Sequence, residues 1–343
     1  MTATIPQPAM TPQQGSDFAE LFRQVKAAGL LGRRPGYYAV KITLTALAFV
    51  GGWVAFALLG DSWWQLAVAA FLGIVFTQMG FLGHDAGHRQ IFRSRWANDL
   101  TGLLHGNLLI GLSFGWWVAK HNAHHGQPNR IGKDPDIGAG AVLFTSDQAR
   151  GRQGVLSRFV GRYQAFLFFP MLLLEGLNLH VSSIQALKAR PAKNRPWEAA
   201  LLLLHLGGYL TAVFLVLSPG QAVAFIAVQQ GLFGLYMGLS FAPNHKGMPM
   251  LAVDEKLDFL HTQVLTARNV RGGLVTDFAL GGLNYQIEHH LFPSMPRPNL
   301  RRVQPMVAEF CARKSVLYTE TSLIDSYRQA LGHLHRVGEP LRT

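Results

Sequence analysis

Histidine is the residue type whose spacing in this chain points most directly to chemistry. Seven of the 14 histidines fall in three short clusters, HDAGH, HNAHH and QIEHH. Their members are His84 and His88, then His121, His124 and His125, then His289 and His290. Residues three or four apart lie on one helix face, where neighbouring imidazoles can bind the same metal ion. The spacing therefore predicts a metal centre to which all three clusters contribute.

The number of histidines predicts two metal ions. Seven imidazoles exceed the about four to six ligands that one ion accepts. The chain has a single cysteine, Cys311, so a thiolate cluster is excluded. Asp85 and Glu288 stand beside predicted ligands. We expect each to orient a histidine ring, because a metal-bound imidazole usually donates its other N–H to such a group.

The composition places these clusters in a membrane protein. Hydrophobic residues make up 49% of the chain, charged residues 15%, and the mean hydropathy is +0.17. No Lys or Arg occurs between Lys41 and Arg89, or between Arg195 and Lys246. Each gap can hold two spans of about 20 residues. The sequence therefore predicts two transmembrane hairpins, residues 42–59 with 63–82 and residues 198–217 with 221–241.

The charge distribution predicts the orientation. The hairpin turns, at Asp61 and at Ser218-Pro219-Gly220, carry no Lys or Arg, whereas the other loops are basic. The positive-inside rule then places both termini and all three clusters in the cytoplasm, on a multi-pass protein of the cytoplasmic membrane. The net charge of +12 suits anionic lipid headgroups or an acidic electron carrier. Nothing in the pattern indicates nucleic-acid binding.

Two further segments, 96–119 and 163–187, also lack Lys and Arg but contain polar residues such as Asp99, His105, Glu175 and His180. Such groups are costly in hydrocarbon, so we interpret both segments as re-entrant or interfacial helices. This interpretation keeps the three clusters on one side of the membrane. His105 and His180 are expected to be buried and hydrogen-bonded, and His205, inside a span, has no predicted role.

The predicted fold is an all-α integral membrane protein. It has four transmembrane helices in two hairpins, interfacial or re-entrant helices, and a cytoplasmic helical cap that carries a di-metal site. Residues 1–36 form a cytoplasmic tail with an interfacial amphipathic helix that begins after Ser16. Residues 37–300 form the membrane domain with the clusters, and residues 301–343 form cytoplasmic helices.

HDAGH, HNAHH and QIEHH, in this order, resemble the histidine boxes of the integral-membrane fatty acid desaturases. The segment GLNYQIEHHLFPSMPRPNL is especially similar to the subgroup whose third box begins with Gln, which includes front-end and bacterial acyl desaturases. The resemblance extends from about His84 to Leu300. It implies a di-iron enzyme that uses O2 and two electrons to remove two hydrogens from an acyl chain, with release of water.

The resemblance also implies the ligands. All seven box histidines would bind iron and carry the reaction. His245 would be an eighth ligand, with Asn244 reaching iron through water, although Asn244-His245 could instead be a helix C-terminal cap. Gln286 stands where many desaturases have a histidine, and the resemblance leaves open whether this weaker donor contacts iron.

The implied partners are an acyl substrate, in CoA, carrier-protein or lipid form, the lipid bilayer and a separate electron donor such as a ferredoxin or an iron–sulfur reductase. A fused cytochrome, haem or flavin is not expected, because the first 36 residues lack a His-Pro-Gly-Gly motif. Trp116 and Trp117 either line an acyl channel or belong to an interfacial aromatic belt. A hydroxylase or ketolase on the same scaffold is the nearest alternative. A histidine-rich metal transporter is less favoured, because the spans 42–59 and 221–241 contain no ionisable residue.

Overall fold

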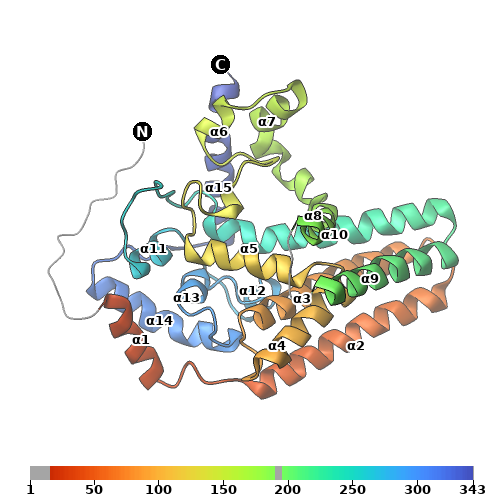
Figure 1. Cartoon of the computed structure of the whole chain (residues 1–343), viewed down its shortest axis with the longest axis horizontal. Coiled ribbons are helices and arrows are strands. Elements are labelled where there is room, and N and C mark those ends of the chain that lie inside the picture. Colours follow the sequence, from red (N-terminus) through yellow and green to blue (C-terminus); the bar gives the residue numbers. More distant parts are fainter. Residues whose placement is uncertain (1–15, 190–194, 343) are drawn as a thin grey trace.

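A computed structural model describes residues 16–189 and 195–342 of the chain, and it is almost entirely helical. Long helices extend to one side of the molecule, and shorter helices gather at their other end as a cap (Figure 1). Residues 1–15 of the expected N-terminal tail, and the basic loop with Arg190 and Lys193, lie outside the described residues.

Four long apolar helices confirm the two predicted hairpins. They are α2 (Pro35–Leu59), α3 (Gln65–Gly87), α9 (Arg195–Val216) and α10 (Pro219–His245). Their most apolar windows have mean hydropathies from 1.5 to 2.1, enough to cross a bilayer. Both turns are where the sequence places them, and the Asp61 carboxylate accepts a hydrogen bond from the Ser218 N–H at 2.8 Å. This bond joins the turn of one hairpin to the turn of the other.

Helix α3 is the centre of the bundle. Its apolar window is 61% buried inside the protein, compared with 17% for α2, so α2 lies at the edge and faces lipid. The core between the helices contains Leu72, Phe76, Phe225 and Phe233. Gly73 allows α3 to approach α10 closely, because a Cβ there would lie 3.0 Å from the Gln229 carbonyl oxygen.

The first doubtful segment does not form a straight span, as predicted. It consists of α4 (Arg95–Gly102), a π-helical stretch η1 (Leu103–Leu109), a turn at Gly111 with φ +69°, and α5 (Phe114–Gly126). Ring Nδ1 atoms satisfy the carbonyl groups that this turn leaves free. His180 lies 2.8 Å from the Gly111 oxygen, and His205, which had no predicted role, lies 2.8 Å from the Leu108 oxygen. Irregular backbone at membrane depth requires such partners.

The start of α9 fixes the start of α5. The Glu198 carboxylate accepts hydrogen bonds from the Ser113 hydroxyl at 2.6 Å and from the Gly115 N–H at 3.3 Å. His105 bonds through Nδ1 to the Thr101 carbonyl at 2.8 Å, so it is a satisfied buried histidine, as expected. These contacts give α5 a fixed position beside α3.

The second doubtful segment is also broken. Helices α7 (Val155–Leu172) and α8 (Glu175–Ala189) meet at a bend of 86°. The bend packs on α10 at Gly234, where a Cβ would lie 2.3 Å from the Gly176 nitrogen. A side chain at position 234 would therefore prevent this close packing.

The cap is built from short helices and one small sheet. Its helices are α1 (Asp17–Ala27), η2 (Pro135–Ile137), α6 (Ser146–Arg150), α11 (Phe259–Leu265), α12 (Leu274–Ala279), α13 (Gln286–Leu291), α14 (Arg297–Arg313), α15 (Leu323–Val337) and η3 (Glu339–Leu341). Strands β1 (Asn269–Val270) and β2 (Glu320–Thr321) pair in parallel. Helix α14 runs through residue 300, so the predicted domain division falls inside a helix.

Helix α1 corrects one prediction. It begins after Ser16, whose side chain accepts a hydrogen bond from the Ala19 N–H, as the sequence indicates. However, Leu21 and Val25 are fully buried in the core of the cap, and Lys314 of α14 pairs with Asp17 at 2.8 Å. The apolar face of α1 is therefore covered by protein and not by lipid, and the expected interfacial position is wrong.

Candidate metal centre

The eight predicted ligands meet where the helix bundle joins the cap. They lie at or just after the C-terminal end of α3 (His84, His88), in α5 (His121, His124, His125), at the end of α10 (His245) and in α13 (His289, His290). The labels of α3, α5, α10 and α13 in Figure 1 show how the two hairpins and the re-entrant segment converge there. The predicted convergence of the three clusters is confirmed.

Four of the histidines form a first group. One ligand nitrogen from each of His84, His88, His121 and His289 lies within 4.8 Å of those of the other three. The His84 and His88 ring centroids are 4.8 Å apart, and each ring lies 4.7 Å from that of His289. These nitrogens are close enough to one another to hold a single metal ion.

Three histidines form a second group. The Nε2 atom of His245 lies 3.0 Å from Nε2 of His290 and 3.4 Å from Nε2 of His124. His125 lies between the groups: its Nε2 is 3.0 Å from Nε2 of His121, and its ring stacks on His290 at a centroid distance of 4.1 Å. The arrangement fits the predicted pair of ions.

The protonation state of these rings suits metal binding. Burial lowers the pKa of His88, His121, His125, His289 and His290 well below the usual range, and repulsion between neighbouring rings lowers it further. The rings are therefore neutral at physiological pH. A neutral imidazole is the form that binds a metal.

Several ring nitrogens have no hydrogen-bond partner among the described residues, although they are buried. They include Nε2 of His84 and His88 and both nitrogens of His289. A buried polar atom without a partner is costly, and a metal ion bound by these nitrogens would remove that cost. The donor set, made of neutral imidazoles, suits iron, copper or zinc.

A buried ion pair supports the first group. Asp85 Oδ1 lies 3.3 Å from Nδ1 of His84, as expected of a residue that orients this ring. The other oxygen, Oδ2, lies 2.6 Å from the guanidinium of Arg297, which is itself buried in α14. Arg297 also donates to the Phe81 carbonyl at 2.8 Å. Thus α14 of the cap holds the end of α3.

The second group has its own carboxylate, which sequence reasoning missed. Both oxygens of Asp134 lie about 3 Å from Nδ1 of His124, at 3.0 and 2.9 Å. Asp134 also accepts the N–H groups of Asn129 at 2.7 Å and Asp136 at 2.8 Å. These bonds hold the carboxylate so that Nε2 of His124 faces the other ligands. The signal available in the sequence was only an Asp in the loop after HNAHH.

The two other members of the second group are oriented by neutral acceptors. His245 bonds through Nδ1 to the Thr266 carbonyl at 3.0 Å, and His290 bonds through Nδ1 to Oε1 of Gln263 at 2.8 Å. Gln263 in turn donates to the His125 carbonyl at 3.0 Å. In both rings Nε2 is left to point at the metal position.

Gln286 and Asn244 lie against this second group. The amide nitrogen of Gln286 is 2.9 Å from Nε2 of His245, and its oxygen accepts a bond from Asn244 at 3.1 Å. The side-chain oxygen of Asn244 is buried and has no partner among the described residues. The polar end of Gln286 is therefore within reach of a metal bound by His245.

Glu288 does not have the position expected of it. Its carboxylate accepts bonds from Asn269 at 2.6 Å and from Tyr318 at 2.8 Å, and not from a histidine ring. Adjacency in sequence does not decide the partner: Asp85 meets the ring of its neighbour His84, whereas the Glu288 carboxylate faces the donors Asn269 and Tyr318. Burial raises the pKa of Glu288 to about 7. Glu288 fixes α13 to β1 and to the segment before β2, and the expectation that it orients an imidazole is wrong.

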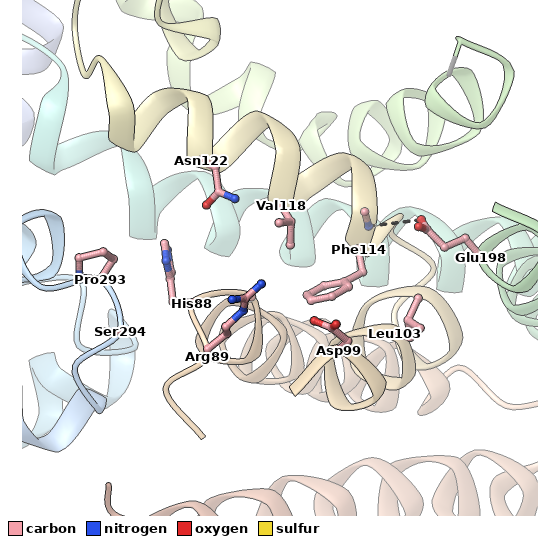
Figure 2. Close-up of a pocket in the computed structure, with 12 residues that line it drawn as sticks. His88, Arg89, Asp99, Leu103, Phe114, Val118, Asn122, Glu198, Pro293 and Ser294 are labelled. Carbon is pink, nitrogen blue, oxygen red and sulfur yellow. Dashed lines mark hydrogen bonds between the residues drawn. The ribbon is translucent and has the colours of Figure 1, made fainter. Parts of the chain in front are cut away.

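A pocket of about 410 Å³ opens beside the first group, with His88 in its wall. Figure 2 shows Val118 and Asn122 of α5 on one side, Asp99 and Leu103 on the other, and Arg89 between them. The neighbouring Trp117 stacks on His121 with ring centroids 4.5 Å apart. Trp117 therefore packs directly against one of the predicted ligands.

The fold and the site define a multi-pass membrane protein with a histidine-built metal centre at one end of its helix bundle. A family model described as fatty acid desaturase matches residues 61–322 of the chain. This match covers most of the described residues and includes all eight histidines. The chain belongs to the fatty acid desaturase family, as its sequence predicted.

Curated relatives agree with this family. The chain is 33% identical to the Delta(8)-fatty-acid desaturase of Euglena gracilis, over 91% of this chain and 76% of that protein. It is 30% identical to the Delta(5) fatty acid desaturase fat-4 of Caenorhabditis elegans, over 92% and 71%. It is 28% identical to an acyl-lipid (9-3)-desaturase of Physcomitrium patens, over 96% and 64%. The chain thus spans 64% to 76% of the lengths of these three relatives.

Proposed function

We propose that this protein is a di-iron acyl desaturase. It converts a CH2–CH2 unit of an acyl chain into CH=CH, and the two hydrogens, two electrons and two protons combine with O2 to give two molecules of water. The observation that carries the proposal is the pair of buried histidine groups in a chain of this family. In this proposal the first ion is held by His84, His88, His121 and His289. The second is held by His124, His245 and His290, with His125 between the two.

Iron bound at both positions would activate O2, which is the oxidant for the two unactivated C–H bonds. The protein's own residues do the rest. Asp85 and Asp134 hold His84 and His124 in the orientation that points a ring nitrogen inward. The burial of the ligands limits the access of water, which would protect the reaction from side reactions. Gln286 and Asn244 occupy the edge of the second position.

The acyl substrate is proposed to approach through the pocket beside His88. Its volume is in the range of ligand sites, and Leu103, Phe114 and Val118 give it apolar walls. Arg89 and Asn122 line the same pocket and can bind a polar carrier group. Selectivity along a uniform chain would depend on how far the chain extends past the iron pair.

The remaining proposals concern placement and partners. The basic loops support an orientation with both termini and the metal centre in the cytoplasm, in the cytoplasmic membrane. The electrons are proposed to come from a separate acidic protein, such as a ferredoxin or an iron–sulfur reductase. The substrate is a fatty acyl group attached to CoA, to a carrier protein or to a lipid.

The test is expression in a host that lacks desaturases, together with a ferredoxin, its reductase and NADPH, followed by double-bond mapping of the fatty acids by mass spectrometry. A new double bond and two iron ions per chain are the expected results. His124→Ala is expected to abolish the product and lower the iron content. His261→Ala changes a histidine of α11 that is bonded to Asp258 and lies outside both groups, so it serves as the control.

Two results would contradict the proposal. Iron that stays at two per chain in His124→Ala would overturn the ligand assignment. Hydroxylated or keto products without an alkene would favour the alternative of a hydroxylase or ketolase.

A further inference from the structure

The short helix α12 exposes large apolar side chains. Leu274, Val275 and Phe278 are 78%, 82% and 58% exposed, and α12 has no buried residue. At 100° per residue these three share one face of the helix, while Thr276 and Asp277 lie on the other. Asp277 accepts a bond from Asn284 at 2.9 Å and lies 3.6 Å from Arg301. The polar face of α12 is thus turned to the cap, and its apolar face is largely exposed.

The contacts of α12 place it at membrane depth. Gln78 of α3 donates to the Phe278 carbonyl at 3.4 Å, and Nζ of Lys41 in α2 lies 4.5 Å from the centre of the Phe278 ring. Gln78 precedes His84 by six residues on α3. At the rise of an α-helix, Gln78 is therefore about 9 Å farther along the helix from the cap than His84 is. Figure 1 shows α12 beside α3 on the side of the cap next to the spans. The end of α12 therefore lies beside the α3 span, farther from the C-terminal end of α3 than His84 does.

The surroundings of this contact identify what covers the apolar face. Val40 and Leu44, which flank Lys41 on α2, are 60% and 61% exposed on a helix that faces lipid. The Lys41 ammonium group donates a hydrogen bond to the Gln78 side chain at 2.6 Å. A lysine of this kind can keep its methylene groups on an apolar surface while its charged end reaches a polar partner. The apolar face of α12 continues this lipid-facing surface.

We propose that α12 inserts into the lipid leaflet nearest the histidine groups, where Leu274, Val275 and Phe278 contact acyl chains. The cap is then attached to the membrane at a second place, separate from the ends of the spans. The partner is the acyl region of a phospholipid bilayer. This inference depends on the membrane fold and not on the proposed reaction.

The test uses the full chain in phosphatidylcholine nanodiscs. The only natural cysteine, Cys311, is buried, so Val275→Cys adds one accessible thiol for an environment-sensitive fluorophore. The Val275 probe is expected to be reduced by dithionite several-fold more slowly than a water-exposed probe, because the charged dithionite ion is excluded from the acyl region in which an interfacial helix buries its apolar face. It is also expected to be quenched by lipids that carry a spin label near the headgroup end of the acyl chain.

Two matched variants calibrate the measurement. Val253→Cys is in the cap loop before α11, where the side chain is 58% exposed, and its probe is expected to react freely with dithionite. Leu44→Cys on α2 gives the lipid-facing reference, and wild-type protein reports any labelling of Cys311. A Val275 probe that reacts as fast as the Val253 probe would overturn the proposal. Protection from dithionite without quenching by labelled lipid would also overturn it, because it would mean that protein covers α12.

Discussion

Arg297 reaches Asp85 across the junction between the cap and the helix bundle, and their charged groups are 2.6 Å apart in a buried setting. The same carboxylate faces His84 with its other oxygen. One ion pair therefore links the position of α14 to the orientation of a predicted metal ligand.

Replacement of Arg297 by Met is expected to remove this link. The substitution leaves Asp85 as a buried charge without its partner, which typically costs about 3–5 kcal/mol of stability. Metal retention is expected to fall with it, because His84 loses its fixed support. The measurements are the melting temperature in detergent and the iron content by mass spectrometry. Arg302→Met, on the exposed side of the same helix, is the control, and equal effects of the two changes would refute the role of the ion pair.

Asp134→Asn tests the carboxylate that orients His124. The Asn amide has a single oxygen, whereas both oxygens of the Asp134 carboxylate face Nδ1–H of His124. A hydrogen-bond partner of a metal-binding histidine typically contributes about 10–100-fold to metal affinity. We expect the iron-to-protein ratio to fall below that of wild type, with the larger loss at the second group. Asp147→Asn, at a 90% exposed side chain in α6, is the matched control. Full occupancy in Asp134→Asn would show that His124 needs no such support.

Gln286 can be tested by restoring the ligand that many related enzymes have. Gln286→Ala is expected to reduce occupancy of the second position, since the amide lies 2.9 Å from Nε2 of His245. Gln286→His is expected to recover it, because imidazole is a better donor to iron than an amide. Metal titration followed by absorption spectroscopy distinguishes the variants. If Gln286→Ala binds two ions as tightly as wild type, Gln286 has no part in holding the metal.

The re-entrant turn is expected to tolerate no side chain at Gly111. A Cβ there would lie 2.4 Å from Cδ2 of His205, and the φ of +69° is strained for other residues. Gly111→Ala is therefore expected to destabilise the protein by about 1–3 kcal/mol from the backbone conformation alone. Gly207→Ala, in α9 with no atom within 4 Å of the added Cβ, serves as the control. Equal melting temperatures for the two variants would contradict this account of the turn.

The spans could be predicted because the physics of a bilayer acts on each stretch of sequence separately. The stretch without Lys or Arg between Lys41 and Arg89 predicts a hairpin from its own residues, without information on the helices that pack against it. The histidine clusters were predictable for a similar reason, since their spacing is local to one helix. The meeting of the three clusters at one end of the bundle then followed from the number of times the chain is predicted to cross the membrane.

The supporting residues were not predictable, because they come from distant parts of the chain. Arg297 acts on a residue more than 200 positions earlier. Gln263 lies in α11 and Thr266 directly follows that helix, and neither stands in a pattern that points to the histidines. The prediction for Glu288 was wrong because residues adjacent in sequence need not face the same partner in space. His205 had no visible role until the carbonyl groups of the re-entrant turn were in place. For α1, the apolar stripe was visible, but not the surface that covers it.

The division of neighbouring histidines between the two groups has a consequence for assembly. Helix α5 supplies His121 to one group and His124 to the other, and α13 supplies His289 and His290 in the same way. An ion bound in either group holds both helices, and this places the ligands of the empty group close to their final positions. We therefore expect loading of the wild-type protein to be cooperative, so that chains with a single ion are fewer than two independent sites would give.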